Sequence, residues 1–290
     1  MKNILLLDGY NLIYRARYSG MNKGSHSTIF NFFRGIRPLV EKFNPDIAYF
    51  VLEGKPVKRL ELDPEYKGQR VYTDKDDFNR QRKDIISIVK EFFPFVVVKH
   101  SDFECDDIIN HLAKVNHKED NVTIVSSDTD FIQSVSENVR LYNPVRKQFI
   151  DGTEYDYVSW KSLVGDKSDN IEGFKGIGNK KALKLLSESK KFEEFMSIQE
   201  NLDKFNRNKF MIKFHELSQE EINNITFNKL LDKPNWSMLK EKFTSYEFSS
   251  LAGKEKTWNN FINTFSNLER NQANVSWKSF IKYSIGTIKS

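Results

Sequence analysis

The sequence predicts an α/β fold, with a mostly parallel central sheet flanked by helices and a helical C-terminal half. Short apolar runs alternate with segments of helical periodicity up to about residue 152. This alternation is typical of strand–helix–strand units and of a parallel sheet with helices on both faces. Beyond that point the strand signals fade, and the remaining segments are helical and rich in Lys, Asn and Phe.

Each expected element has a start or stop signal. The strands are expected at residues 4–7, 47–52, 95–98, 122–125 and 139–142. The helices of this half are expected at residues 28–43, 76–93 and 104–115. Asp8-Gly9 marks a turn after the first strand, and Asn44-Pro45 ends the first helix. The third helix is expected to bury one face that carries Ile108, Leu112 and Val115.

This pattern predicts two domains, an α/β core over residues 1–152 and a helical region over residues 153–290. The helical region is expected to pack on the sheet domain. Its aromatic residues are predicted to form a helical core rather than a surface for a partner protein. These residues are Phe243, Phe248, Trp258, Phe261 and Phe265.

Composition narrows the class of protein. The hydrophobic content of 39% is enough for a core, and the net charge of +5 is compatible with a polyanionic partner. No apolar stretch approaches the ~18 residues of a membrane span, so no membrane association is expected. The single cysteine, Cys105, cannot form an internal disulfide. An intracellular, cytoplasmic protein is therefore expected.

Nine carboxylates fall in five short clusters, most of them directly after an apolar run. They are Asp8; Glu53; Glu104, Asp106 and Asp107; Asp128 and Asp130; Asp166 and Asp169. Any one cluster has a structural explanation, since acids also cap helices. Their joint occurrence at strand ends favours a basin where carboxylates are held together by cations. Two Mg²⁺ ions, or Mn²⁺ in their place, suit such oxygen ligands and would serve phosphodiester hydrolysis.

A glycine-rich segment is the sharpest local motif. Gly173, Gly176 and Gly178 permit a tight hairpin, and a helix is expected to begin near Gly178. Lys180 and Lys181 add positive charge beside helix amides that suit a phosphate. The segment from about 156 to 187 looks like a helix-hairpin-helix element, which grips a DNA backbone without reading its sequence. The alternative is an ordinary glycine-rich turn.

A basic segment with one aromatic residue precedes the second helix. Tyr66, Lys67 and Arg70 are followed by further cations at positions 80, 82 and 83. An aromatic ring beside such cations can stack on a base while the cations hold phosphate. For positions 80–83 a solvated helix face is an equal alternative.

Taken together, these motifs resemble the 5′ nuclease superfamily. The superfamily contains flap endonucleases, the 5′–3′ exonuclease domain of bacterial DNA polymerase I, and phage 5′ exonucleases and RNase H proteins, and the phage type is most similar in size. The matching segments are "LLLDGYN", "RLELDPEYKGQR", "FECDD", "IVSSDTDF" and "VGDKSDNIEGFKGIG". The resemblance runs from Ile4 to about Leu186. Glu53 stands where the family usually has Asp.

The resemblance assigns a role to each motif. One metal ion would be held by Asp8, Glu104, Asp106 and Asp128, and Asp130, Asp166 and Asp169 would lie around the second. Glu53 and Asp107 are counted with the metal-binding acids. Lys67 and Arg70 would contact the scissile phosphate, and Tyr66 and Arg59 would contact the nucleic acid. Residues 66–86 would belong to an arch for a 5′ single strand, and the Gly173–Gly178 hairpin would hold duplex, with a monovalent cation between it and the phosphate.

The sequence therefore predicts a metal-dependent, structure-specific 5′ nuclease. It would cut near the 5′ ends of RNA or DNA on duplex and remove primers in replication, as a monomer in the cytoplasm (of a host cell, if phage-encoded). A PIN-type ribonuclease and a non-catalytic, structure-specific DNA-binding protein are the alternatives. A haloacid-type phosphatase would need an acid at position 10, where this chain has Tyr10.

Overall fold

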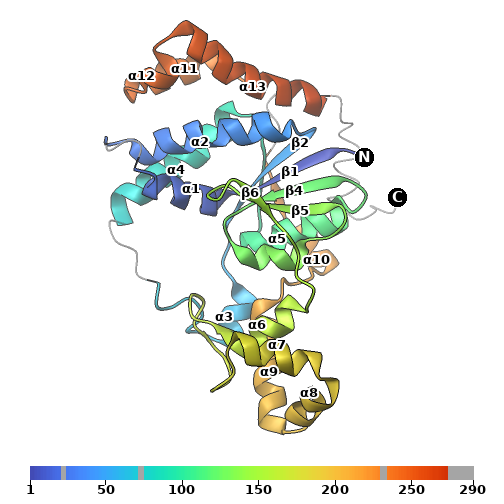
Figure 1. Cartoon of the computed structure of the whole chain (residues 1–290). Helices are drawn as coiled ribbons and strands as arrows, with labels where there is room; N and C mark the ends of the chain where they lie inside the picture. The colour runs from blue at the N-terminus through green and yellow to red at the C-terminus, as the bar shows by residue number, and fades with distance from the viewer. Residues whose placement is uncertain (21–23, 71–74, 229–233, 274–290) are drawn as a thin grey trace.

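A seven-stranded sheet forms the centre of the computed structural model, which describes residues 1–20, 24–70, 75–228 and 234–273 (Figure 1). The strand order is β6-β5-β4-β1-β2-β3-β9. The bounds are β1 Asn3–Asp8, β2 Ile47–Leu52, β3 Val96–Lys99, β4 Asn121–Val125, β5 Val139–Asn143, β6 Gln148–Ile150 and β9 Thr226–Phe227. Strands β1 to β5 run parallel, and the two edge strands are antiparallel. The predicted mostly parallel sheet and its five predicted strands are confirmed.

Helices cover both faces of the sheet. The helices of the N-terminal half are α1 Gly9–Tyr18, α2 Ser27–Phe43, α3 Val57–Leu62, α4 Lys75–Phe92, α5 Cys105–His111, the π turn η1 Leu112–Asn116 and the 3-10 turn η2 Thr129–Ser134. Alternate side chains of a strand point to opposite faces. Leu5 and Leu7 of β1 therefore pack in the layer of α1, α2 and α4, whereas Ile4 and Leu6 pack against α5 and η1.

The C-terminal helices complete the first of these layers. They are α11 Trp236–Ser245, α12 Ser249–Ala252 and α13 Glu255–Ala273, whereas the short α10 Gln219–Asn223 lies on the side of α5 (Figure 1). Helices α11 to α13 lie along α2 (Figure 1). Phe261 and Phe265 are fully buried, and both contact Phe93, which also stacks on Phe33. The predicted aromatic core of this region is confirmed, and it is shared with the sheet domain.

A separate group of helices lies at the opposite end of the molecule from α11–α13 (Figure 1). It contains α3, α6 Tyr157–Val164, α7 Asn179–Ser187, α8 Ser189–Met196 and α9 Gln199–Ile212, with the small hairpin β7 Gly165–Asp166 and β8 Ile171–Glu172. The expected glycine hairpin lies between α6 and α7, and Gly178 is the N-cap of α7. Gly176 has φ +78°, and a Cβ at Gly173 would lie 2.0 Å from the Val164 carbonyl oxygen. Both positions therefore require glycine.

Two local expectations are wrong. Asp8-Gly9 is not a turn: Asp8 is the N-cap of α1, and its Oδ1 accepts a hydrogen bond from the Asn11 amide at 3.0 Å. The predicted helix over residues 104–115 also breaks up, because its last turn is the wider π turn η1. A π turn rotates the side chains that follow it. Ile108 and Leu112 are buried as expected, but Val115 is 53% exposed.

Strands also occur after residue 152, where none is expected from the sequence. Strands β7, β8 and β9 each have two residues, and a strand of that length has no periodic pattern to detect. β9 pairs with β3 and becomes one edge of the central sheet. The predicted arch over residues 66–86 includes residues 71–74, which lie outside the described residues. Within the described ranges, none of the helices is both long and apolar enough to cross a membrane.

Candidate active site

Five carboxylates meet at the carboxyl edge of the sheet, and we call them the inner acid cluster. They are Asp8, Glu53, Glu104, Asp106 and Asp128. Asp8 ends β1, whereas Glu53 and Asp128 follow β2 and β4 closely. Glu104 and Asp106 are brought beside them at the start of α5, after β3. Since β4, β1, β2 and β3 are neighbours in the sheet, all five side chains line one cleft of about 630 Å³. The predicted convergence of these acids is therefore seen in the structure.

Hydrogen bonds fix the direction of two of these carboxylates. Asp8 is 4% exposed, and it accepts hydrogen bonds from the Asn11 amide and, at 2.7 Å, from the Ser126 hydroxyl. Asp128 caps η2, and its Oδ1 accepts a hydrogen bond from the Asp130 amide at 2.9 Å. Asp8 and Asp128 thus do cap helices, which is the structural explanation given above for single acid clusters. These roles coexist with the cluster, because a capping carboxylate keeps lone pairs that can bind a cation.

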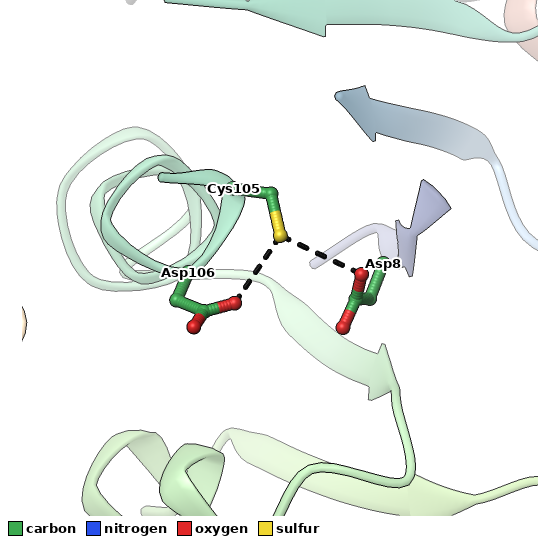
Figure 2. A group of neighbouring side chains, drawn as sticks. All are labelled: Asp8, Cys105 and Asp106. Atoms are coloured by element: carbon green, nitrogen blue, oxygen red, sulfur yellow. Dashed lines mark hydrogen bonds between the residues drawn. The ribbon is translucent and has the colours of Figure 1, made fainter. Parts of the chain in front are cut away.

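The thiol of Cys105 lies between two members of the cluster (Figure 2). Its Sγ is 3.5 Å from Asp8 Oδ1 and 3.2 Å from Asp106 Oδ1. One ligand atom from each of these three residues lies within 4.8 Å of the other two. The donors of the inner cluster are otherwise all oxygens, which fit a hard divalent ion such as Mg²⁺ or Mn²⁺.

Crowding and burial disfavour negative charge in the inner acid cluster. Burial, with Glu104 next in importance, raises the pKa of Glu53 to about 7. Burial, followed by the charge of Asp130, raises the pKa of Asp128 to about 6. Burial also raises the pKa of Asp8, and burial together with the neighbouring carboxylates raises that of Asp106. Without bound cations, ionising this cluster therefore costs folding free energy.

This cost predicts how metal and pH act on stability. A carboxyl group with a raised pKa in the folded state gives stability at low pH that is lost as the pH rises through that pKa. In EDTA the melting temperature should therefore fall between about pH 5 and pH 8, and the increase caused by millimolar Mg²⁺ should be larger at about pH 8 than at about pH 5. Thermal melts over a pH series, with Mg²⁺ or EDTA, measure this. An Mg²⁺ effect of the same size at every pH would contradict it.

Three further carboxylates form an outer acid cluster: Asp130, Asp166 and Asp169. One oxygen from each lies within 4.8 Å of the other two. Lys161 of α6 lies between two of them: its Nζ forms an ion pair with Asp130 and another, at 2.5 Å, with Asp166. Burial alone would raise the pKa of Asp166, but hydrogen bonds from Lys161 and Ser168 outweigh it, and the pKa is lowered. The Lys161 ammonium thus neutralises part of the negative charge of the outer acid cluster.

The segment with the predicted catalytic cations links the two clusters. The Tyr66 hydroxyl lies 3.1 Å from Glu104 Oε2 and 3.1 Å from Asp169 Oδ2. Lys67 Nζ forms an ion pair with Glu104 and lies 3.6 Å from Asp169. Arg70 Nη2 is 2.6 Å from Asp169 Oδ1. Lys67 and Arg70 therefore lie in the cleft, as the sequence predicts.

Tyr66 has a different place from the one expected. Its side chain is 5% exposed, and its ring packs with Ile171, Met211 and Ile212. The residue still lines the cleft, where Lys67 Nζ lies 4.9 Å from the centroid of its ring. Its hydroxyl contacts Glu104 and Asp169.

Arg59 and Asp107 form a buried pair rather than part of the cleft. Arg59 is 3% exposed, and its guanidinium contacts both oxygens of Asp107 at 2.7 and 3.0 Å. It also donates to Glu104 Oε2 at 2.9 Å and to the carbonyl oxygens of Met211 and Lys213. Asp107 is fully buried and accepts a further hydrogen bond from the His215 amide. Arg59 is thus buried and outside the cleft lining, and so is Asp107.

The glycine hairpin carries exposed lysines, in contrast to the acid clusters of the cleft. Gly176 and Gly178 are exposed, as are Lys180 and Lys181 at the start of α7. Lys175 and Lys184 are exposed on the same segment. This surface is positively charged and lies at the N-terminus of α7, where the helix dipole favours an anion.

Several side chains of the site are missed by sequence reasoning. Lys161 is the most informative, because it is a lone lysine in the otherwise apolar or small stretch of α6, and that pattern was a usable signal. Ser126 and Asn11 orient acid residues, but neither belongs to a charged pattern. Cys105 lies inside the acidic segment Glu104–Asp107, but a lone cysteine carries no sequence pattern that predicts a place between two carboxylates.

Comparison with known families decides what kind of site this is. The 5′-3′ exonuclease N-terminal resolvase-like domain matches residues 3–161, and the 5′-3′ exonuclease C-terminal SAM fold matches residues 153–234. The chain belongs to the 5′-3′ exonuclease family. The resemblance predicted from the motifs is therefore confirmed for the superfamily.

Individual relatives agree with this family. A 5′-3′ exonuclease of Aquifex aeolicus is 29% identical over 287 residues, which cover 87% of this chain and 94% of that protein. A 5′-3′ exonuclease of Mycoplasma pneumoniae is 31% identical over 71% of this chain and 78% of its own length. DNA polymerase I of Lactococcus lactis is 30% identical over 230 residues, which cover 69% of this chain and 25% of that polymerase.

Solved structures share the fold of this exonuclease family member. A bacteriophage T5 flap endonuclease, in a pseudo-enzyme-product complex with DNA and metal ions, has a TM-score of 0.60 at 20% identity, covering 93% of this chain and 99% of that chain. Human GEN1 in complex with Holliday junction DNA has a TM-score of 0.57 at 16% identity, covering 94% and 75% of the two chains. At these identities the likeness concerns the fold.

Proposed function

We propose that this protein is a divalent-metal-dependent 5′ nuclease that acts as a 5′–3′ exonuclease and flap endonuclease. It hydrolyses phosphodiester bonds near the 5′ ends of DNA or RNA on a duplex. The observation that carries this proposal is the convergence of acids from separate strand ends into one cleft that also holds Lys67 and Arg70. Acidic ligands and phosphate-binding cations in one cleft fit metal-assisted phosphodiester hydrolysis.

We assign the inner and outer acid clusters to two divalent ions, which we propose to be Mg²⁺, with Mn²⁺ as a substitute. When bound, such ions lower the pKa of an attacking water and offset the charge on the leaving oxygen. Lys67 and Arg70 are paired with Glu104 and Asp169. Once cations engage those carboxylates, both side chains are available to the scissile phosphate. We assign Arg59 and Tyr66 to positioning, because both hold Glu104 in place.

The substrate follows from the rest of the surface. Gly173, Gly176 and Gly178, with Lys180 and Lys181, are proposed to hold the backbone of duplex beyond the cut, with a monovalent cation between the hairpin and a phosphate. We propose flap DNA and RNA–DNA hybrids as substrates and primer removal in replication as the task. A monomer in the cytoplasm, where replicating DNA lies, is sufficient for this. A phage source stays a prediction, because a bacterial exonuclease matches over a comparable length.

The test uses two 5′-labelled substrates, a 5′-flap duplex and an RNA–DNA hybrid, each with Mg²⁺ and with EDTA. The proposal expects cleavage of both in Mg²⁺ and of neither in EDTA. Preference for single-stranded RNA without a duplex would support the PIN-type alternative. Binding without cleavage would support the non-catalytic one. The match to both 5′-3′ exonuclease domains favours the proposal over these two.

Replacing Lys67 by alanine tests the role of the cation in the cleft. An ammonium that stabilises charge developing on the phosphate acts mainly in the transition state. The single-turnover rate of Lys67→Ala should therefore fall by about 10²–10³-fold, with little change in DNA affinity. Quenched-flow cleavage and a binding titration in Ca²⁺ measure the two quantities.

Lys118→Ala is the matched control, because Lys118 is exposed and precedes β4, at the opposite edge of the sheet. It should cut as fast as the wild type. A normal rate for Lys67→Ala would remove Lys67 from the mechanism.

A further inference from the structure

The segment of residues 65–70 brings Lys67 and Arg70 into the cleft, and it lies against the loop of residues 167–170 between β7 and β8. The two cations form ion pairs with acids that are proposed to bind metal. These ion pairs weaken once a bound cation offsets the charge of the carboxylates. The segment therefore needs other contacts to keep its place when metal is bound.

Two neutral side chains supply contacts that do not involve a carboxylate. Gln69 Nε2 donates a hydrogen bond to the Lys167 carbonyl oxygen at 2.6 Å. In the opposite direction, Asn170 Nδ2 donates to the Glu65 carbonyl oxygen at 3.0 Å. We call these two hydrogen bonds the amide clamp. Their acceptors are backbone oxygens, which bear no net charge for a metal ion to offset, so the clamp is compatible with the metal-free and the metal-bound site.

The backbone on both sides of this contact has an uncommon conformation. Asn170 has φ +62°, in the left-handed region that asparagine adopts more readily than most residues. Lys67 has φ +56°, and its amide donates to the Asp169 carbonyl oxygen at 3.1 Å. Such a conformation costs energy for a lysine and persists where the surrounding contacts enforce it. The contact with the loop thus holds Lys67 in a shape that it rarely adopts alone.

The same loop continues directly into the glycine hairpin. Strand β8 follows Asn170, pairs with β7 and ends at Glu172, the residue before Gly173. Asn208 of α9 is fully buried and donates to the carbonyl oxygens of Glu172 and Ser162, at 2.9 Å each. The step from Asn170 to Gly173 spans at most about 10 Å of chain. The clamp and the hairpin therefore belong to one tightly braced unit.

We infer that the amide clamp determines which phosphodiester bond is cut, because it holds Lys67 and Arg70 at a fixed distance from the hairpin that is proposed to grip duplex. The scissile phosphate is then selected by its distance from the duplex and not by base sequence. Gln69 and Asn170 are positioning residues, which act through the two cations. This inference rests on the proposed nuclease function and deepens it.

Two hydrogen bonds provide the precision that this selection needs. Neighbouring phosphates of one duplex strand lie about 3.4 Å apart along the helix axis. A hydrogen bond of this kind keeps its heavy atoms within about 2.7–3.2 Å of each other, so its slack is well below that step. A segment held by the clamp cannot shift by one phosphate, whereas a segment without it can.

The experiment maps the cut on a 5′-labelled flap duplex in Mg²⁺, with products resolved to one nucleotide. Asn170→Gly keeps the left-handed backbone but removes the donor, and Asn170→Asp keeps the size but cannot donate. Gln69→Met keeps the length without the amide. In each variant the ratio of products cut one nucleotide away to the main product should rise by about fivefold, the effect of one lost hydrogen bond. Combining Gln69→Met with Asn170→Gly should raise it by about 25-fold.

Glu247→Gly and Gln219→Met are the matched controls. Glu247 also has a left-handed backbone, with φ +61°, but it is exposed between α11 and α12 at the opposite end of the molecule (Figure 1). Gln219 is exposed on α10, where its amide donates to Asn223 Oδ1 at 3.1 Å. Both controls should give the product ratio of the wild type. Clamp variants that cut more slowly but keep the wild-type ratio would overturn the inference, because a merely structural defect slows every cut alike.

A second measurement does not depend on cleavage. Amide hydrogen exchange of residues 65–70 is followed in EDTA and in Mg²⁺. In Mg²⁺ it should be about fivefold faster in each single clamp variant than in the wild type and the controls. Equal exchange in all these proteins would overturn the inference. If the wild type cuts no flap in Mg²⁺, the proposed function fails, and the exchange rates still decide whether the clamp holds the segment.

Discussion

Replacing Asp106 by asparagine is expected to abolish metal-dependent cleavage and to stabilise the metal-free protein. Asp106 faces Asp8, Glu53 and Asp128, and its carboxylate accepts a weak hydrogen bond from the Cys105 thiol. Removing its charge takes away a metal ligand but also removes repulsion among buried carboxylates. We expect a loss of cleavage of at least about 10³-fold, since a bound metal ion supplies several kcal/mol of transition-state stabilisation.

The stability arm of this experiment separates a functional cluster from an ordinary one. In EDTA at neutral pH, Asp106→Asn should melt about 2–4 °C higher than the wild type for each kcal/mol of repulsion removed. In Mg²⁺ the order should reverse, because the variant binds the ion less tightly. Asp151→Asn is the control, since Asp151 is exposed after β6, and it should leave both melting and cleavage unchanged. A variant that melts lower than the wild type in EDTA would show that Asp106 has structural contacts that outweigh the repulsion.

Replacing Arg59 by methionine is expected to cost about 3–5 kcal/mol of unfolding free energy, the usual result of removing one partner of a buried ion pair. Asp107 would be left fully buried with no cation, and Glu104 would lose one of the groups that hold it. Two backbone carbonyls at the end of α9 would lose their donor as well. Urea unfolding measures the loss. Cleavage should fall too, because the direction of Glu104 depends on this contact.

Two further variants make the Arg59 result specific. Arg207→Met removes a half-exposed arginine, whose pair with Asp63 has an N–O distance of 2.7 Å, and it should cost less than about 1 kcal/mol. The double variant Arg59→Met with Asp107→Leu should regain much of the lost stability, because it leaves no unpaired charge at position 107. A double variant as unstable as Arg59→Met alone would mean that the carbonyl contacts, and not the buried carboxylate, dominate.

The sheet and the inner acid cluster could be predicted because their signals are local. Strands β1, β2 and β4 are apolar runs that fit strands buried on both faces, and an acid ends each of them or follows it closely. Once the strands are parallel, Asp8, Glu53 and Asp128 must lie along one edge. No long-range information is needed for that step.

The direction of Arg59 and Tyr66 could not be predicted from such signals. The segment that contains them looks basic and aromatic, which is compatible with a nucleic-acid surface. Arg59 is buried because the end of α9 folds over it, and its contact with Met211 joins positions 152 residues apart. Tyr66 is buried by residues of the same region, including Ile171 and Ile212. Local composition holds no information about partners at that distance.

The positions of Val115 and Lys161 could not be predicted from the sequence for two other reasons. Helical periodicity assumes a regular helix, so the π turn at Leu112–Asn116 moves Val115 away from the predicted face. Lys161 breaks an apolar pattern, and such a break indicates a buried charge with a partner, but the partners on η2 and β7 are defined only by the fold.

The position of α13 has a consequence for the synthesis of the protein. This helix packs on α2 and β2, which are formed by residues near the start of the chain. Phe33 and Phe93 belong to the surface that it and α11 cover. During synthesis this apolar surface therefore stays exposed to solvent until α11 and α13 have left the ribosome. Exposed apolar surface of this kind is what chaperones bind.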